Sequence, residues 1–184
     1  MARLFVAVDL PHVAISALAA VQPANAPGMR LVAPEQMHIT LHFIGVAETD
    51  RMANALIGLA SPAFALSISG VGRFRSAGGN VTLWAGISDC AELQRLHADV
   101  AAALAVVGFQ PEARPYTPHI TLARCKPDAA AIVVDEFLSR HADFGLAAVP
   151  ITRFGLYSSE FVGGVPVYRC ERAFPLVAGR GGSA

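Results

Sequence analysis

The sequence is poor in cysteine, and the cysteines it has form no recognisable pattern. Cys90, Cys125 and Cys170 are an odd number, and none of them belongs to a Cys-x-x-Cys pair. A disulfide framework needs an even set of cysteines, and a zinc knuckle needs closely spaced ones. The sequence therefore argues against both kinds of structure, and we expect the three thiols to be reduced and structural.

The sequence also lacks an excess of charge of either sign. Its formal net charge at pH 7 is zero and its isoelectric point is about 7.0. Proteins that hold long nucleic acid use many lysine and arginine contacts to phosphates, which release counterions. Without an excess of positive charge over the whole protein, any RNA contact should be local and directed at an end of the strand. Lys126 is the single lysine, so the basic residues are almost all arginines, whose planar guanidinium suits phosphate oxygens.

Long apolar runs are absent as well, and none approaches the roughly 20 residues needed to cross a membrane. Residues 1–10 lack the basic start, the long apolar run and the small-residue cleavage site of a secretory signal peptide. We therefore expect a cytoplasmic protein with no membrane partner.

The sequence does contain enough apolar material for a substantial core, since 54% of its 184 residues are hydrophobic. That length fits one domain, or two small lobes that share a core. Hydrophobic periodicity and turn residues predict both helices and strands. We expect helices at 11–22, 48–60, 88–107 and 128–141, and strands at 3–9, 29–32, 37–44 (stopped by Gly45), 64–74, 81–87, 119–124, 144–157 (interrupted by Pro150) and 167–174.

These segments alternate between helices and hairpin pairs, without a steady strand-helix-strand rhythm, which favours an α+β fold with antiparallel sheet. The second half of the chain echoes the first. We predict a bilobal protein whose two pseudo-symmetric lobes present their sheets to a central cleft, with the helices packed outside. Residues 1–178 would form this single domain, and residues 179–184, which are small and polar, a flexible C-terminal tail.

One tetrapeptide, His-Ile-Thr-Leu, occurs twice, at 38–41 and at 119–122. On a strand, alternate side chains point to opposite faces, so His and Thr share one face while Ile and Leu share the other. A single His-x-Thr is equally well explained by a solvated polar face. A second copy with the same spacing favours a function, because two equivalent strands can bring four reactive side chains to one cleft. These are His38, Thr40, His119 and Thr121.

This set of side chains suits displacement at phosphorus. An in-line reaction needs one group to take a proton from the attacking oxygen and another, on the opposite side, to protonate the leaving oxygen. Histidine titrates near neutral pH and can do either. The hydroxyls of Thr40 and Thr121 can donate hydrogen bonds to the non-bridging phosphate oxygens. The two motifs therefore predict a phosphodiester site that needs no metal ion.

Other residues near the motifs are candidates for the cleft. Strict alternation places His42 on the face of His38. No acidic or cysteine residue accompanies His42 at ligand-like spacing, so we interpret it as a cleft wall and not as a metal ligand. Several aromatic side chains could stack on a terminal base, although core packing would explain each of them as well. These aromatic residues are Phe5, Phe43, Trp84 and Tyr116.

Four segments carry a resemblance to a known family: LFVAVDLP at 4–11, PEQMHITL at 34–41, YTPHITLAR at 116–124 and FGLYSSE at 154–160. They resemble the two-histidine phosphoesterases, and within them the bacterial and archaeal RNA 2′,3′-cyclic phosphodiesterases, once called 2′-5′ RNA ligases. The resemblance runs nearly from end to end of the chain. A lone His-x-Thr is a weak signal, whereas the pair in this context is a specific one.

The resemblance implies a two-lobed fold with a central cleft, and opening of an RNA 2′,3′-cyclic phosphate to a 2′-phosphate with no metal or cofactor. It makes His119 the proton acceptor that activates water and His38 the proton donor to the departing 3′ oxygen. The near symmetry of the motifs leaves these roles exchangeable on the sequence alone. Arg124 matches an arginine that helps to hold the phosphate. Alternation turns Arg124 away from His119 unless a bulge or strand end at Ala123 intervenes.

Two other interpretations stay open. A related enzyme could use the same histidines on a small cyclic nucleotide or on ADP-ribose cyclic phosphate, and only substrate profiling separates it from an RNA-end enzyme. A non-catalytic nucleotide-binding module could keep the cleft without turnover, although two complete motifs argue against it. The expected partner is an RNA with a 2′,3′-cyclic phosphate end or a small cyclic nucleotide, and we expect a monomer.

Overall fold

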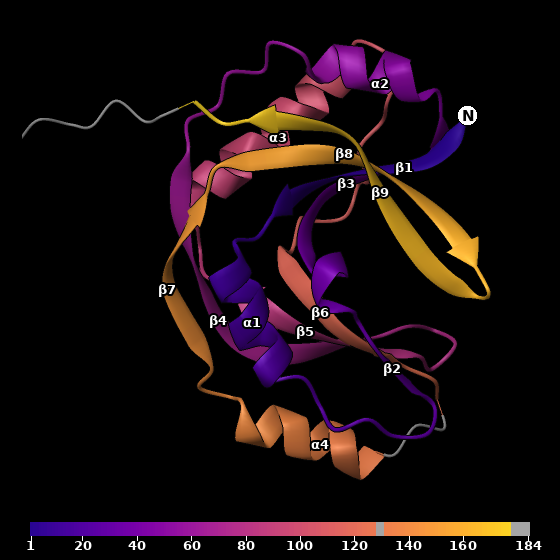
Figure 1. The fold of residues 1–184 in the computed structure, drawn as a ribbon, viewed down its shortest axis with the longest axis vertical. Coiled ribbons are helices and arrows are strands. Elements are labelled where there is room, and N and C mark those ends of the chain that lie inside the picture. The colour runs from indigo at the N-terminus through magenta and orange to yellow at the C-terminus, as the bar shows by residue number, and fades with distance from the viewer. Residues whose placement is uncertain (128–130, 178–184) are drawn as a thin grey trace, which may run out of the picture.

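A computed structural model of the protein describes residues 1–127 and 131–177, and Figure 1 shows how its elements are arranged. The elements follow the predicted order along the chain. The helices are α1 (His12–Ala20), α2 (Thr49–Leu56), α3 (Ala91–Ala105) and α4 (Ala131–Arg140), with a short 3-10 turn η1 (Pro34–Gln36). The strands are β1 (Ala2–Asp9), β2 (Met29–Leu31), β3 (His38–Ala47), β4 (Phe64–Arg75), β5 (Val81–Ile87), β6 (His119–Cys125), β7 (Gly145–Ile151), β8 (Arg153–Val162) and β9 (Val165–Pro175).

All of these strands belong to one sheet, in the order β7-β4-β5-β6-β3-β1-β8-β9, with β2 paired to β6. Each of these strand pairs is antiparallel. The sheet curls, so that β7 stands at one end and the long β8–β9 hairpin projects at the other (Figure 1). The predicted α+β class with antiparallel sheet is confirmed.

The two motif strands meet at the centre of the sheet. β3 and β6 pair at one position, Ile39 with Ile120, which are the equivalent residues of the two motifs. Four strands of the main order lie on each side of this contact, β7-β4-β5-β6 on one side and β3-β1-β8-β9 on the other. The approximate twofold axis predicted from the repeat therefore passes between Ile39 and Ile120, and the two lobes are halves of one continuous sheet.

One face of the sheet carries the hydrophobic core. Ile39 and Ile120 are fully buried and belong to the same cluster as the buried residues of the helices. The helix residues in this cluster are Ala14 and Leu18 of α1, Met52, Ala53 and Leu56 of α2, Leu93, Leu96, Val100 and Leu104 of α3, and Val134 and Phe137 of α4. The helices thus cover the face that bears the apolar motif residues, which leaves the face with the histidines for function.

Two predicted boundaries are wrong for a physical reason. β3 continues through Gly45 to Ala47, because Gly45 takes a positive φ of 85° in a register shift against β1, and the shift bends the strand without ending it. Pro150 does not interrupt β7. It lies in an edge strand of the sheet, where a residue without an N–H donor is tolerated, and the break between strands falls at Thr152.

Some predictions concern residues outside the described ranges. The start of the helix predicted at 128–141, the domain boundary at 178 and the C-terminal tail at 179–184 all lie outside the described residues. Among the helices that the structure does describe, none has the length and the apolar character that a membrane crossing requires.

Candidate active site

The two motif histidines are held in the same way. His38 donates from Nδ1 to the backbone carbonyl of Gln36 (2.6 Å), and His119 donates from Nδ1 to the backbone carbonyl of Thr117 (2.8 Å). A carbonyl oxygen can only accept, so in both rings Nδ1 carries a hydrogen. The other ring nitrogen, Nε2, is therefore the atom of each histidine that can exchange a proton with a ligand.

A β-bulge at the leucine of each motif reverses the alternation that follows. Against β1, Thr40 pairs with Ala7 and His42 pairs with Val6, so Leu41 is the extra residue. The second motif repeats this at the same place. Against β5, Thr121 pairs with Trp84 and Ala123 pairs with Leu83, which makes Leu122 the extra residue. The two motif strands therefore have the same local structure, with a bulge at the equivalent leucine.

The second bulge brings Arg124 to the face of His119. Ala123 is fully buried on the core side, and Arg124, the next residue, is exposed on the opposite side. The bulge invoked for Arg124 therefore exists, one residue before Ala123. The guanidinium lies close enough to both motif histidines that its charge lowers the pKa of His38 and of His119. Arg124 is thus placed to contact a ligand held between the two imidazoles.

The first bulge has the opposite consequence for His42, and the predicted place of this residue on the His38 face is wrong. His42 is buried on the core side, where its Nε2–H donates to the backbone carbonyl of His97 (2.8 Å) and its ring stacks on the His97 ring at 4.1 Å. Phe43 takes the place on the motif face, five residues after His38 as Arg124 is five residues after His119. The arginine contribution is therefore one-sided.

Tyr116 makes contacts that support the two motif strands. Its hydroxyl donates to the backbone carbonyl of Thr40 (3.1 Å), across the gap where β3 and β6 diverge. Its ring stacks on His97 of α3 at 3.9 Å. Burial raises the pKa of the phenol, so the hydroxyl stays a donor. These contacts favour a structural role over base stacking.

Each motif histidine lies near aromatic side chains from other strands of the sheet. The His38 ring is 5.1 Å from Phe5 and 5.5 Å from Tyr168. The His119 ring is 4.9 Å from Phe74 and 6.4 Å from Trp84. Aromatic rings at these distances pack against the imidazoles and favour particular orientations of their planes.

The Trp84 ring lies against Gly72, the residue that pairs with it on β4, because this position has no side chain. A Cβ at Gly72 would come within 2.3 Å of the indole ring. The indole Nε1 is buried and has no hydrogen-bond partner among the described residues.

Tyr168 and Phe74 were not recognised from the sequence. Phe74 pairs with Thr82 across the hairpin around 76–80, so the register of this hairpin could have indicated that Phe74 lies near the site.

The electrostatic surroundings of the two histidines are similar but not identical. Burial is the main cause that lowers the pKa of each below the usual histidine value of 6.5. The carboxylate of Asp9 acts in the other direction, but on His38 alone. Asp9 stands opposite His38 in the β1–β3 register and accepts hydrogen bonds from Arg153 and Tyr157. His119 has Gly86 in the corresponding position on β5, and the charge of Arg114 lowers its pKa further.

The two threonines complete the site. Thr40 Oγ1 lies 3.1 Å from His38 Nε2, so this hydroxyl is beside the atom that would exchange a proton. The antiparallel contact between Ile39 and Ile120 sets His38 across from Thr121 and Thr40 across from His119. Each histidine therefore has one threonine from its own motif and one from the other lobe.

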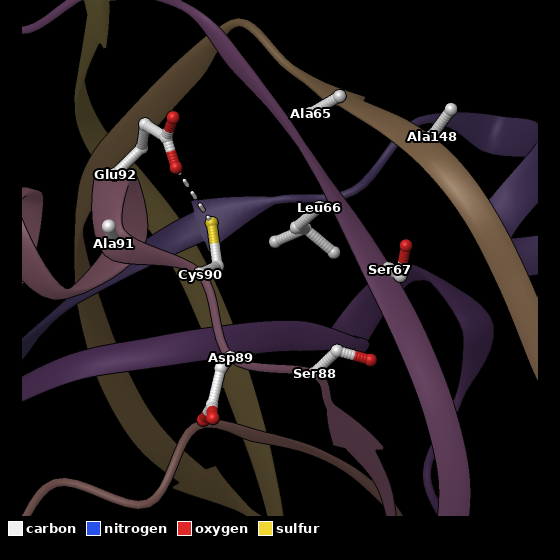
Figure 2. A pocket seen from close by; sticks show the side chains of 9 residues that line it. All are labelled: Ala65, Leu66, Ser67, Ser88, Asp89, Cys90, Ala91, Glu92 and Ala148. Atoms are coloured by element: carbon white, nitrogen blue, oxygen red, sulfur yellow. Dashed lines mark hydrogen bonds between the residues drawn. The ribbon is translucent and has the colours of Figure 1, made fainter.

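One hollow in the protein lies away from the motif face. Figure 2 shows that hollow, which is lined by residues at the start of α3 and along β4, among them Cys90, Asp89 and Ser67. None of its lining residues belongs to either motif. Within residues 1–127 and 131–177, His, Cys, Asp and Glu side chains form no group of three or more that could hold a metal ion.

Comparison with known proteins agrees with this arrangement. A model of the 2'-5' RNA ligase superfamily matches residues 10–160. A curated relative, the RNA 2',3'-cyclic phosphodiesterase of Archaeoglobus fulgidus, is 30% identical over 183 residues, which cover 94% of this chain and 99% of that protein. Another, the RNA 2',3'-cyclic phosphodiesterase of Geobacillus stearothermophilus, is 31% identical over 181 residues. That alignment covers 94% of this chain, which spans only 57% of the longer relative.

Solved structures share the fold. A crystal structure described as a phosphoesterase has a TM-score of 0.76 at 25% sequence identity, covering 95% of this chain and 98% of that one. The Escherichia coli LigT structure complexed with 3'-AMP has a TM-score of 0.74 at 24% identity, with the same coverage, and it bears on the fold alone. Because the family model spans most of the sequence and both motifs, this chain belongs to the 2'-5' RNA ligase superfamily.

Proposed function

We propose that this protein hydrolyses the 2′,3′-cyclic phosphate at the end of an RNA to a 2′-phosphate, by paired histidine acid and base catalysis without a metal ion. The observation that carries the proposal is the presentation of two Nε2 atoms, with identically held Nδ1 atoms, on one face of the central strand pair. The printed names of the curated relatives, RNA 2',3'-cyclic phosphodiesterases from several organisms, support the choice of substrate.

In the proposed reaction a water oxygen forms a bond to phosphorus while the bond from phosphorus to the 3′ oxygen breaks. The neutral Nε2 of His119 takes the proton of the water. The Nε2–H of His38 gives its proton to the departing 3′ oxygen, which becomes a hydroxyl. The phosphate stays attached through its 2′ oxygen. Negative charge that builds on the non-bridging oxygens is met by the guanidinium of Arg124 and the hydroxyls of Thr40 and Thr121.

The charges around the two histidines support this assignment of acid and base. The proton donor must hold a proton before the reaction, and the acceptor must lack one. Asp9 favours the protonated form of His38, whereas His119 has a glycine in that position and the further positive charge of Arg114. Asp9 therefore favours the donor role for His38 and Arg114 favours the acceptor role for His119, while burial, the largest cause at both rings, lowers the pKa of each.

The proposal is tested by incubating the purified protein with a short RNA that ends in a 2′,3′-cyclic phosphate, in excess EDTA, and identifying the product. We expect a 2′-phosphate, because the donor on the His38 side protonates the 3′ oxygen. A 3′-phosphate product, or turnover that disappears in EDTA and returns with a divalent cation, would contradict the mechanism. Turnover of small cyclic nucleotides or ADP-ribose cyclic phosphate, but not of RNA, would support the related-enzyme alternative. Binding without turnover of any of them would support the non-catalytic module.

The pH dependence of kcat/KM should be bell-shaped with its optimum on the acid side of 6.5, since the pKa of both free histidines is lowered. As pH rises through the pKa of His38 the donor is lost, and as pH falls through the pKa of His119 the acceptor becomes protonated. The profile of kcat should lie at higher pH, because a bound phosphate favours both imidazolium ions. A kcat/KM optimum above about pH 7.5, well beyond the ordinary histidine range, would contradict this prediction.

A further inference from the structure

A second arginine stands directly beside Arg124 on the motif face. β2 pairs with β6, and in that register Arg30 lies opposite Arg124. The neighbours of Arg30 on β2, Met29 and Leu31, pair with Cys125 and Ala123, both of which are buried on the core side. Alternation therefore puts the Arg30 side chain on the other face, which is the face of His119 and Thr121.

The arginine pair brings two like charges side by side. Like charges directly opposite each other on antiparallel strands, with Cβ atoms about 5 Å apart, destabilise the pairing. Among the described residues, neither Arg30 nor Arg124 forms an ion pair with a carboxylate. The other arginine next to a motif histidine, Arg114, pairs with Glu112. In a chain with zero net charge, two adjacent arginines that pair with no carboxylate of the described residues form a local site for anions.

The two arginines differ in their effect on the motif histidines. The charge of Arg124 acts on both motif histidines, whereas that of Arg30 is not among the causes that shift the pKa of either one. On the other side of Arg124 stands Thr82, also on the motif face. Arg30, Arg124 and Thr82 thus form a row of donors across three strands.

We infer that Arg30 binds a second phosphate of the substrate, the one attached to the 5′ oxygen of the nucleotide that carries the cyclic phosphate. This inference rests on the proposed function and deepens it. Arg124 would be engaged by the reacting phosphate, so a second anion one nucleotide bond away would meet Arg30 next. Such a contact gives the enzyme a preference for a cyclic phosphate whose nucleotide also carries a 5′-phosphate. A cyclic phosphate with a free 5′-hydroxyl would lack this contact.

The test compares two substrates that differ only at the 5′ oxygen: adenosine 2′,3′-cyclic phosphate with a 5′-hydroxyl, and the same compound with a 5′-phosphate. The measured quantity is the ratio of their kcat/KM values. The Arg30→Gln variant should reduce the advantage of the 5′-phosphorylated substrate by roughly tenfold, as expected for one charge-assisted hydrogen bond. For a dinucleotide substrate, the slope of log(kcat/KM) against log salt should fall by about 0.7 for the lost phosphate contact. Arg95→Gln, which removes an exposed arginine of α3, is the matched control and should leave the ratio unchanged.

A binding measurement separates failure of this inference from failure of the proposed function. Calorimetry with adenosine 2′-monophosphate and adenosine 2′,5′-bisphosphate needs no turnover. Wild-type protein should prefer the bisphosphate, and Arg30→Gln should lose that preference. If neither cyclic compound is opened but this binding pattern is found, the proposed function fails and the arginine site stands. A different result would overturn the arginine site and leave the proposed function standing. In that result both cyclic compounds are opened, and Arg30→Gln keeps the wild-type ratio of kcat/KM values and the wild-type preference for binding the bisphosphate.

Discussion

Replacing His119 with alanine is expected to lower kcat for cyclic phosphate opening by roughly 10²- to 10⁴-fold, the range for a positioned acid or base. The reason is that Nε2 of His119 is the proposed acceptor for the proton of water, and the neighbouring rings, Phe74 and Trp84, cannot accept a proton. His38→Ala should cause a loss of the same order, since the 3′ oxygen would then leave without a proton. Both losses should be measured as kcat under saturating substrate.

The two histidines can be told apart with a substrate whose 3′ oxygen is replaced by sulfur. A thiol has a pKa near 8.5, far below that of an alcohol, so it leaves with little need of a proton donor. The sulfur substrate should restore most of the lost rate to His38→Ala but not to His119→Ala. Equal recovery in both variants would remove the assigned roles. His12→Ala, which changes an exposed histidine of α1, is the control and should keep wild-type kcat.

Thermal unfolding of the same variants shows whether the losses are chemical. His38 and His119 lie on the motif face, outside the hydrophobic cluster, and each makes one hydrogen bond to a nearby backbone carbonyl. Loss of such a bond costs about 1 kcal/mol of unfolding free energy, a small part of the stability of a domain this size. A variant that is inactive and folded at the assay temperature therefore reports on the reaction itself.

The sequence was informative wherever the local pattern decides the structure. Alternation within each His-Ile-Thr-Leu segment predicts which side chains share a face, and the structure places Ile39 and Ile120 in the core as that pattern requires. The repeat also predicts the approximate twofold axis, because equivalent strands of a repeated unit meet at such an axis. What local pattern cannot supply is the place where pairing slips by one residue.

The bulges at Leu41 and Leu122 are the clearest case. A bulge depends on hydrogen bonds between strands that are far apart in the sequence, so alternation counted along one strand passes over it. For this reason the pattern put His42 on the wrong face and left the direction of Arg124 undecided. Asp9 and Tyr168 were missed for a related reason, since only the register of β1 and the packing of β9 bring them to His38.

The structure also explains how a nearly symmetric site could favour one direction of proton transfer. The two motifs match in their backbone contacts and bulges, but their neighbours differ. Asp9 faces His38 where Gly86 faces His119, and Phe43 stands where the other lobe has Arg124. The asymmetry therefore lies in the surrounding strands, and exchange of the catalytic roles would require changes at these positions more than at the histidines.

Arg124→Gln is expected to lower kcat by roughly 10²-fold, because removal of one preorganised donor to a developing negative charge typically costs 10²- to 10³-fold. It should also raise the pKa of both motif histidines, since the charge of Arg124 lowers the pKa of each. The bell-shaped kcat/KM profile should therefore move to higher pH as a whole. A purely structural role for Arg124 could reduce the rate, but it would not move both limbs in the same direction.

Arg124→Lys separates charge from geometry in the same experiment. Lysine keeps the positive charge but lacks the planar fork that can meet two phosphate oxygens at once. The pH profile of Arg124→Lys should therefore stay close to that of the wild type, while its kcat falls between the wild type and Arg124→Gln. If Arg124→Gln keeps the wild-type kcat and pH profile, the bulge at Leu122 does not serve the reaction, and the reacting phosphate must be held by the two threonines alone.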